Sequence, residues 1–133
     1  MTLDELASAV ASRLVSEGFT VHRYDAFSTN SIYLKLDYGA CGSLRISDHP
    51  GYKHLKYRWN IGSHIDAVSH KGGCYPRSYY PTAKWERMVQ HAVKERAKRQ
   101  EAGGYEQRIK DGMRQKEHAT YGFWAHPETR EVT

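Results

Sequence analysis

The sequence predicts an α+β domain, in which an N-terminal helix and a long C-terminal helix pack on one face of an antiparallel sheet of four or five strands. Between Ser31 and Ile61 apolar and polar residues alternate, which is the period of strands with one buried face. An amphipathic helical stripe on each side of this block offers one apolar side. Such helices and strands bury their apolar faces against one another as two layers. The apolar strand positions are Ile32, Leu34, Leu36, Leu44, Ile46, Leu55, Tyr57, Trp59 and Ile61.

The two predicted helices begin at recognisable caps. Thr2 and Glu5 have the T-x-x-E spacing of a capping box, and the helix that they open runs to about Glu17, with Gly18 as its C-terminal glycine. Thr82 is the predicted cap of the long C-terminal helix. The apolar stripe of that helix consists of Trp85, Met88, Val89, Ala92 and Val93.

Hairpins join the main strands in this prediction. A first short strand lies near Phe19–Tyr24, and turns over residues 38–42 and 48–51 connect the next three strands. Residues 77–80 add a fifth short strand. Residues 1–102 form the core domain. The Gly103-Gly104 break separates this core from a helical extension and an aperiodic tail over residues 103–133, which belong to the same domain or form an arm at a subunit interface.

Composition predicts a soluble cytoplasmic protein. The chain has 133 residues, of which 39% are hydrophobic and 26% charged, and its ten Tyr and three Trp supply enough aromatic mass for a core. No run approaches the ~18 apolar residues of a membrane span, and the N-terminal segment is acidic and amphipathic, unlike a targeting signal. Cys41 and Cys74 lack C-x-x-C spacing, and we expect both thiols to be reduced.

The net charge of +5 is concentrated in the predicted C-terminal helices. Residues 84–116 hold ten basic and five acidic residues, so this segment carries the whole surplus. Phosphate groups are the physiological anions that such a surface is best suited to attract, as in nucleotides and nucleic acids. The alternative is that these Lys and Arg side chains only solvate a helix face.

The polar face of the predicted sheet is basic as well. Arg45 and Arg58 lie on neighbouring predicted strands and are suited to hold one phosphate, because guanidinium groups bind phosphate bidentately. An ordinary solvated face, neutralised locally by Asp37 and by hydroxyl groups, is the alternative. The basic and amide side chains predicted on this face are Lys35, Arg45, His54, Lys56, Arg58 and Asn60.

Aromatic side chains in the run C-Y-P-R-S-Y-Y-P offer a second means of binding a nucleotide. Tyr79 and Tyr80 can stack on a base, which is worth ~1–3 kcal/mol per ring, or they can belong to the junction of sheet and helix. Strand alternation sends these two tyrosines to opposite faces.

Catalytic and metal-binding patterns are weak. His64, His70 and Cys74 form an H-x5-H-x3-C string that matches no common zinc motif, so we expect no bound metal. Asp48 and His49 have no nucleophile beside them and fit a hairpin turn. We therefore expect a protein that is not an enzyme, needs no cofactor and binds its ligand without converting it.

The runs N-S-I-Y-L-K-L-D-Y-G, G-S-L-R-I-S-D-H and K-H-L-K-Y-R-W-N-I, over residues 30–61, resemble a motif of small, mostly phage- or prophage-encoded bacterial proteins. This group is the Thoeris anti-defence nucleotide sponges, and looser similarity continues through the Y-Y-P segment and the helical region. The resemblance implies a non-enzymatic oligomer that sequesters signal nucleotides of bacterial immune enzymes, such as cyclised ADP-ribose isomers or cyclic oligonucleotides. It also implies a pocket closed by aromatic and arginine side chains, partly from the C-terminal helix of a neighbouring subunit.

The resemblance further implies that the helix arginines are either Arg96 and Arg99 or Arg108 and Arg114. The extension after Gly103-Gly104 departs from the family pattern, which leaves the C-terminal contacts open. We therefore predict a cytoplasmic homo-oligomer that binds a phosphate-bearing signal nucleotide, on either the basic sheet face or the basic helix. The alternative is a phage protein that binds nucleic acid or blocks a host defence complex. The predicted ligand-binding residues are Arg45, Lys56, Arg58, Asn60, Tyr79, Tyr80 and these four arginines.

Overall fold

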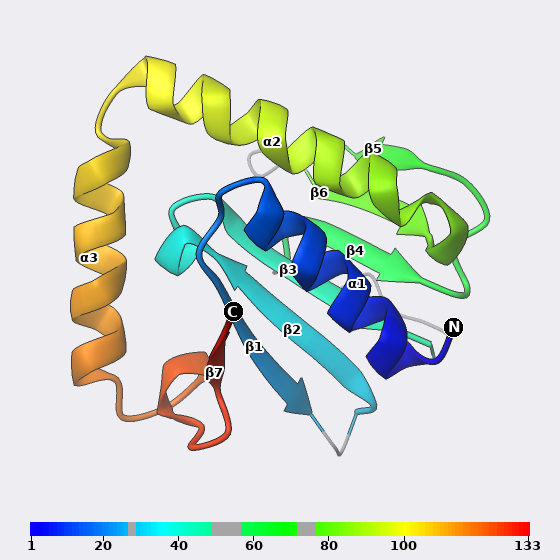
Figure 1. Ribbon diagram of the computed structural model, residues 1–133, viewed down its shortest axis with the longest axis horizontal. Coiled ribbons are helices and arrows are strands. Elements are labelled where there is room, and N and C mark those ends of the chain that lie inside the picture. Colours follow the sequence, from blue (N-terminus) through cyan, green and yellow to red (C-terminus); the bar gives the residue numbers. More distant parts are fainter. Residues whose placement is uncertain (27–28, 49–56, 72–76) are drawn as a thin grey trace.

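A computed structural model describes residues 1–26, 29–48, 57–71 and 77–133 of the chain. Within these residues three α-helices accompany one seven-stranded sheet (Figure 1). The helices are α1 (Leu3–Ser16), α2 (Trp85–Ala102) and α3 (Tyr105–His118). The strands are β1 (Val21–Ala26), β2 (Ser31–Leu36), β3 (Gly42–Ser47), β4 (Trp59–Gly62), β5 (Ser69–Lys71), β6 (Arg77–Pro81) and β7 (Arg130–Val132).

The sheet is mixed, with the strand order β5-β6-β4-β3-β2-β1-β7. β1, β2 and β3 form an antiparallel meander, whereas β4 runs parallel to β3 and β6 runs parallel to β4. β5 and β7 add antiparallel edge strands. The predicted α+β class is confirmed. The prediction of an antiparallel sheet of four or five strands is wrong, because the described residues contain seven strands in both orientations.

The direction of β4 was predicted wrongly because an alternating pattern contains no information about strand direction. In the structure Leu44 lies beside Trp59 and Ile46 beside Ile61, in parallel register. A period of two shows which face each side chain occupies, and it is the same whichever way the strand runs. The predicted hairpin at 48–51 and the strand start near Leu55 fall largely on residues 49–56, outside the described part. β4 itself begins only at Trp59.

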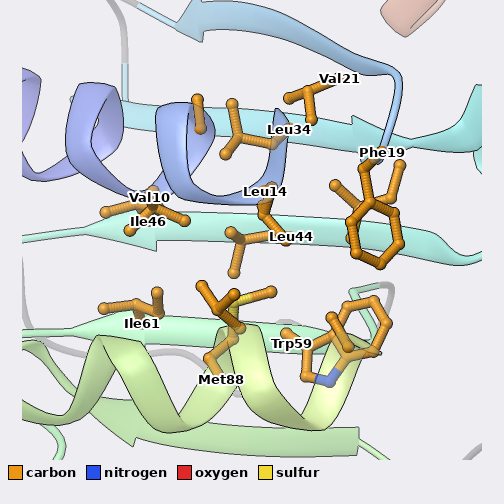
Figure 2. Close-up of a cluster of buried hydrophobic side chains, with 14 of the residues drawn as sticks. Val10, Leu14, Phe19, Val21, Leu34, Leu44, Ile46, Trp59, Ile61 and Met88 are labelled. Atoms are coloured by element: carbon orange, nitrogen blue, oxygen red, sulfur yellow. The ribbon is translucent and has the colours of Figure 1, made fainter. Parts of the chain in front are cut away.

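Alternation predicted the buried face of the sheet correctly for β2, β3 and β4. The side chains of Leu34, Leu44 and Trp59 are fully buried, as are their apolar neighbours on the same face. α1 lies across β2 and β3, and α2 lies across β4 and β6, on this one face (Figure 1). Val10, Leu14 and Met88 reach from the helices into the layer between helices and sheet (Figure 2). The core therefore lies between one face of the sheet and two helices.

Tyr57 departs from the predicted alternation. The prediction placed it on the apolar face with Trp59, but its ring lies against Tyr33 on the opposite face, with the ring centroids 5.0 Å apart. Tyr57 precedes the first residue of β4, so the rule of alternating faces does not yet apply to it.

The start of α1 confirms the predicted cap, and the start of α2 does not. The Thr2 hydroxyl accepts from the Glu5 N–H at 3.1 Å, and the Glu5 carboxylate accepts from the Thr2 N–H at 3.2 Å, so the capping box is complete. Thr82 instead opens a 3-10 turn, Thr82–Lys84, and α2 begins at Trp85 without a side-chain cap. Across the described residues, no helix has both the length and the apolar character needed to traverse a bilayer.

The C-terminal helical segment is divided between α2 and α3, which meet at an angle at Gly103 and Gly104 (Figure 1). Both glycines have positive φ, at 88° and 82°, and the chain turns sharply at them between the two helices. α3 then packs against the left-handed turn that follows β2, Asp37–Gly39. The Tyr105 hydroxyl donates to Asp37 Oδ2 at 2.6 Å, which ties the first turn of α3 to this loop.

The tail after α3 closes over the polar face of β1. The imidazole of His22, which is 1% exposed, contacts the Tyr38 ring at 5.0 Å and the Trp124 ring at 4.8 Å between centroids. Its Nε2 lies 3.4 Å from Lys116 Nζ of α3 and 3.7 Å from the Glu131 carboxylate of β7. Burial, followed by the charge of Lys116, lowers the pKa of His22. The sequence pattern missed β7 because three residues are too few to show a period.

Candidate functional site

A hollow of about 450 Å³ lies between α2 and the edge of the sheet, and we call it the α2 pocket. Its helical wall consists of Arg87, Gln90, His91 and Lys94, at positions i, i+3, i+4 and i+7 of one helix face. The side chains of β5, β6 and the residue before β4 form the opposite wall. No carboxylate of the described residues lines this hollow, whereas three cationic side chains do. The residues of the opposite wall are Arg58, Val68, His70, Ser78 and Tyr80.

The hydrogen bonds of His91 determine which ring nitrogen faces the pocket. Trp59 Nε1 lies 3.3 Å and the Tyr80 hydroxyl 2.6 Å from His91 Nδ1. An indole N–H can only donate, so Nδ1 is the acceptor and the proton of the neutral ring is on Nε2. Burial, followed by the charges of His70 and Arg58, lowers the pKa of His91 and favours this neutral ring. His91 therefore offers the pocket an N–H donor.

His70 and Tyr80 complete the middle of the pocket. His70 Nδ1 lies 2.8 Å from the Ser78 hydroxyl, and its ring meets the His91 ring edge to face with centroids 5.0 Å apart. Burial raises the pKa of Tyr80 to about 12, so its hydroxyl stays protonated and donates to His91 at neutral pH. Together these side chains form a hydrogen-bonded centre between the cations.

Glu95 links two of the predicted arginines. Its Oε1 accepts from Arg58 Nη2 at 3.1 Å and from Arg99 Nε at 3.2 Å. Burial opposes ionisation of Glu95, but the charges of Arg58 and Arg99 outweigh it and lower the pKa of Glu95. The ionised carboxylate therefore offsets about one of the two positive charges.

A second hollow, of about 360 Å³, lies where α2 and α3 meet the turn after β2, and we call it the α3 pocket. Lys35, Arg99 and Arg108 line it, with Asp111 as the acidic residue among the described lining side chains. The Lys35 ammonium lies 5.0 Å from the centre of the Phe123 ring, and burial lowers the pKa of Lys35. Arg99 Nη1 also donates to the Ala40 carbonyl at 2.6 Å, so this guanidinium group links α2 to the chain between β2 and β3.

The structure thus distributes the predicted site residues over several places. Arg58 and Tyr80 meet in the α2 pocket, and Arg99 and Arg108 meet in the α3 pocket. Arg45 lies on the other face of the sheet, where it is 6% exposed and interacts with the Tyr33 hydroxyl. Asn60 and Tyr79 follow Arg45 in register across β4 and β6. The predicted alternation of Tyr79 and Tyr80 is confirmed, but Tyr80 is too buried to stack on a base.

Arg96 and Arg114 line neither pocket. Arg96 Nη2 donates to the Glu17 carbonyl at 2.6 Å, and its guanidinium lies 3.9 Å from the centre of the Phe19 ring. This arginine therefore joins the end of α1 to α2. Arg114 is exposed and lies near Asp111 one turn earlier in α3. Lys56 lies outside the described residues.

The continuous basic sheet face that the sequence predicted does not form among the described residues. Lys35 belongs to the α3 pocket, Arg58 turns toward Glu95 of α2, and Arg45 is buried. The sequence analysis also missed the helical wall of the α2 pocket. Its signal was present as the spacing of Arg87, His91 and Lys94 on the polar side of the predicted stripe.

Histidines of the H-x5-H-x3-C string have other partners. His64 Nε2 lies 3.1 Å from the Asp48 carbonyl, and His70 bonds to Ser78. Cys74 lies outside the described residues. Among the residues that the structure places, no three His, Cys, Asp or Glu side chains converge as metal ligands would.

Comparison with known proteins adds no further assignment. The chain matches no protein-family model, and the comparisons with curated proteins and with solved structures give no match. The geometry of the two pockets therefore carries the functional argument.

Proposed function

We propose that this protein binds a phosphate-bearing signal nucleotide in the α2 pocket and sequesters it without converting it. The observation that carries the proposal is the lining of the pocket, where Arg58, Arg87 and Lys94 face a hollow without a described carboxylate. Its volume of about 450 Å³ lies within the range of small-molecule sites. An anionic ligand complements the positive charge of this lining.

The polar groups at the centre of the pocket support binding over turnover. A general base needs a free lone pair, but His91 Nδ1 already accepts from Trp59 and Tyr80. Tyr80, with its pKa raised to about 12, is not ionised at neutral pH. Both groups are thereby held as neutral donors. This arrangement supports binding over catalysis. The role of a phage anti-defence sponge in the bacterial cytoplasm is proposed on the sequence resemblance alone.

The proposal is tested by calorimetry with cyclised ADP-ribose isomers and cyclic oligonucleotides. The protein should bind one of them, and mass spectrometry after denaturation should recover the ligand unchanged. The double variant Arg87→Ala/Lys94→Ala should weaken binding about tenfold or more for each charged hydrogen bond lost. The control Lys98→Ala/Lys110→Ala removes the same charge from exposed positions of α2 and α3 outside both pockets and should leave affinity nearly unchanged.

A nucleic-acid-binding function is the second candidate, because basic side chains continue beyond the pocket along α2 and α3. The two functions differ in salt dependence. A polymer that engages six or more phosphates loses about 10³-fold or more in affinity between 50 and 200 mM salt, whereas a small nucleotide loses far less. The sponge function would be rejected if the affinity for duplex DNA of random sequence fell steeply with salt and calorimetry detected no heat of binding for any nucleotide.

Self-association is part of the proposal. A lone helix as polar as the end of α2 gains little stability by itself, which would favour packing against a partner subunit. In the structure Arg96 and Arg99 anchor this end to carbonyl groups of Glu17 and Ala40 in the same chain. We therefore propose a homo-oligomer on the family resemblance alone, to be tested by sedimentation at micromolar concentration.

A further inference from the structure

The positive charges of the α2 pocket lie at its two ends. Arg87 and Lys94 are seven residues apart on one helix face, which separates their backbones by ~10 Å along the axis. α2 runs opposite to β4 (Figure 1), and Arg58, just before β4, reaches Glu95 beside Lys94. Arg58 and Lys94 therefore share one end of the pocket, and Arg87 forms the other.

The end that holds Lys94 carries more positive charge than the end that holds Arg87. Glu95 offsets about one positive charge of the Arg58–Arg99 pair, so Lys94 and the remaining charge of that pair lie opposite the single charge of Arg87. Between them lie Gln90 and the neutral imidazole of His91, which present amide and N–H groups. Among the described lining residues, the Arg and Lys side chains thus lie at the two ends of the pocket, with Gln90 and the His91 ring between them.

We propose that the ligand is a nucleotide whose two phosphate groups are separated by a nucleoside, an inference that rests on the proposed function of this pocket. The two phosphates of a diphosphate, as in a cyclised ADP-ribose isomer, share one bridging oxygen and lie too close together to meet both ends. The inference therefore narrows the candidate signals to those with separated phosphates, such as cyclic oligonucleotides. A sugar and base between two phosphates instead place neutral groups against Gln90 and His91. Such a ligand satisfies both cationic ends and leaves no charge facing the neutral centre.

Three commercially available adenine nucleotides vary the spacing and the number of phosphates on one base. Adenosine 3′,5′-bisphosphate has separated phosphates, ADP has adjacent phosphates and AMP has one. In calorimetry we expect the bisphosphate to bind about tenfold more tightly than ADP. Arg87→Ala should weaken binding of the bisphosphate about tenfold and leave binding of AMP nearly unchanged, because a single phosphate binds at the end that holds Arg58 and Lys94. Lys94→Ala should weaken both.

Arg87→Gln serves as a second variant, and thermal unfolding of each variant confirms that it is folded. Lys110→Ala, at an exposed position of α3 outside the pocket, should leave all three affinities unchanged. Binding of ADP that equals or exceeds that of the bisphosphate would overturn the inference, as would equal weakening of AMP and bisphosphate by Arg87→Ala. The proposed function survives both of those results. If none of the three nucleotides, nor any cyclic nucleotide, binds, the proposed function fails together with this inference.

Discussion

Gly112 is the position in α3 where the fold leaves no room for a side chain. A Cβ built there would lie 2.1 Å from the carbonyl oxygen of Tyr38 and 2.7 Å from its Cβ. Ordinary van der Waals contacts of carbon begin near 3.4 Å, so Gly112→Ala must move α3 away from the turn Asp37–Gly39 by about 1 Å or more. The obstruction is backbone, which cannot rotate aside.

The expected loss of stability has two parts. Overpacking of this kind costs about 1–3 kcal/mol, and separation of the Tyr105 hydroxyl from the Asp37 carboxylate costs a further ~1.5–3 kcal/mol. Helix propensity opposes these losses, because Ala is favoured over Gly by about 1 kcal/mol within a helix. We expect Gly112→Ala to lower the free energy of unfolding by about 2–4 kcal/mol.

Urea unfolding, followed by tryptophan fluorescence and by far-UV circular dichroism, measures this loss. Lys110→Ala, an exposed position two residues earlier in α3, is the matched control and should change stability by less than about 0.5 kcal/mol. If Gly112→Ala instead stabilised the protein by the ~1 kcal/mol of helix propensity, the close packing of α3 on Tyr38 would be refuted.

Three further predictions concern buried groups. The pKa of His22 is lowered in the folded protein, so the unfolded chain binds more protons and the free energy of unfolding falls as pH drops from about 6.5 through the folded pKa. His22→Phe should make the free energy of unfolding, measured by urea titration between pH 7.5 and 5, depend less on pH. An unchanged pH dependence would exclude His22 as its source. Arg96→Gln should lower stability by about 1–3 kcal/mol through the lost bond to Glu17, with nucleotide affinity unaltered in calorimetry. Burial raises the pKa of the Cys41 thiol to about 11. In a variant that lacks Cys74, iodoacetamide should therefore label Cys41 only after the protein unfolds. Rapid labelling of the native protein would contradict the burial of Cys41.

Some residues of the candidate site could be predicted from the sequence, but their grouping in space could not. Arg58 and Tyr80 were predicted as ligand residues and do line the α2 pocket. Their predicted neighbours Arg45 and Asn60 lie on the opposite face, because Arg58 precedes β4 and does not follow its alternation. Which residues share a pocket depends on which helix covers which strands, and that information lies in contacts between residues far apart in the chain.

The sequence by itself determined the α+β class, the complete capping box at Thr2 and the buried face of β2, β3 and β4. Each of these follows from interactions within a few residues, namely a local hydrogen-bond pair or the period of one strand. Only the tertiary structure decided that β4 runs parallel to β3 and that α2 brings Arg87 and Lys94 over Arg58. Strand direction and helix placement leave no mark on the period of a pattern, because they are settled by pairing and packing between distant segments.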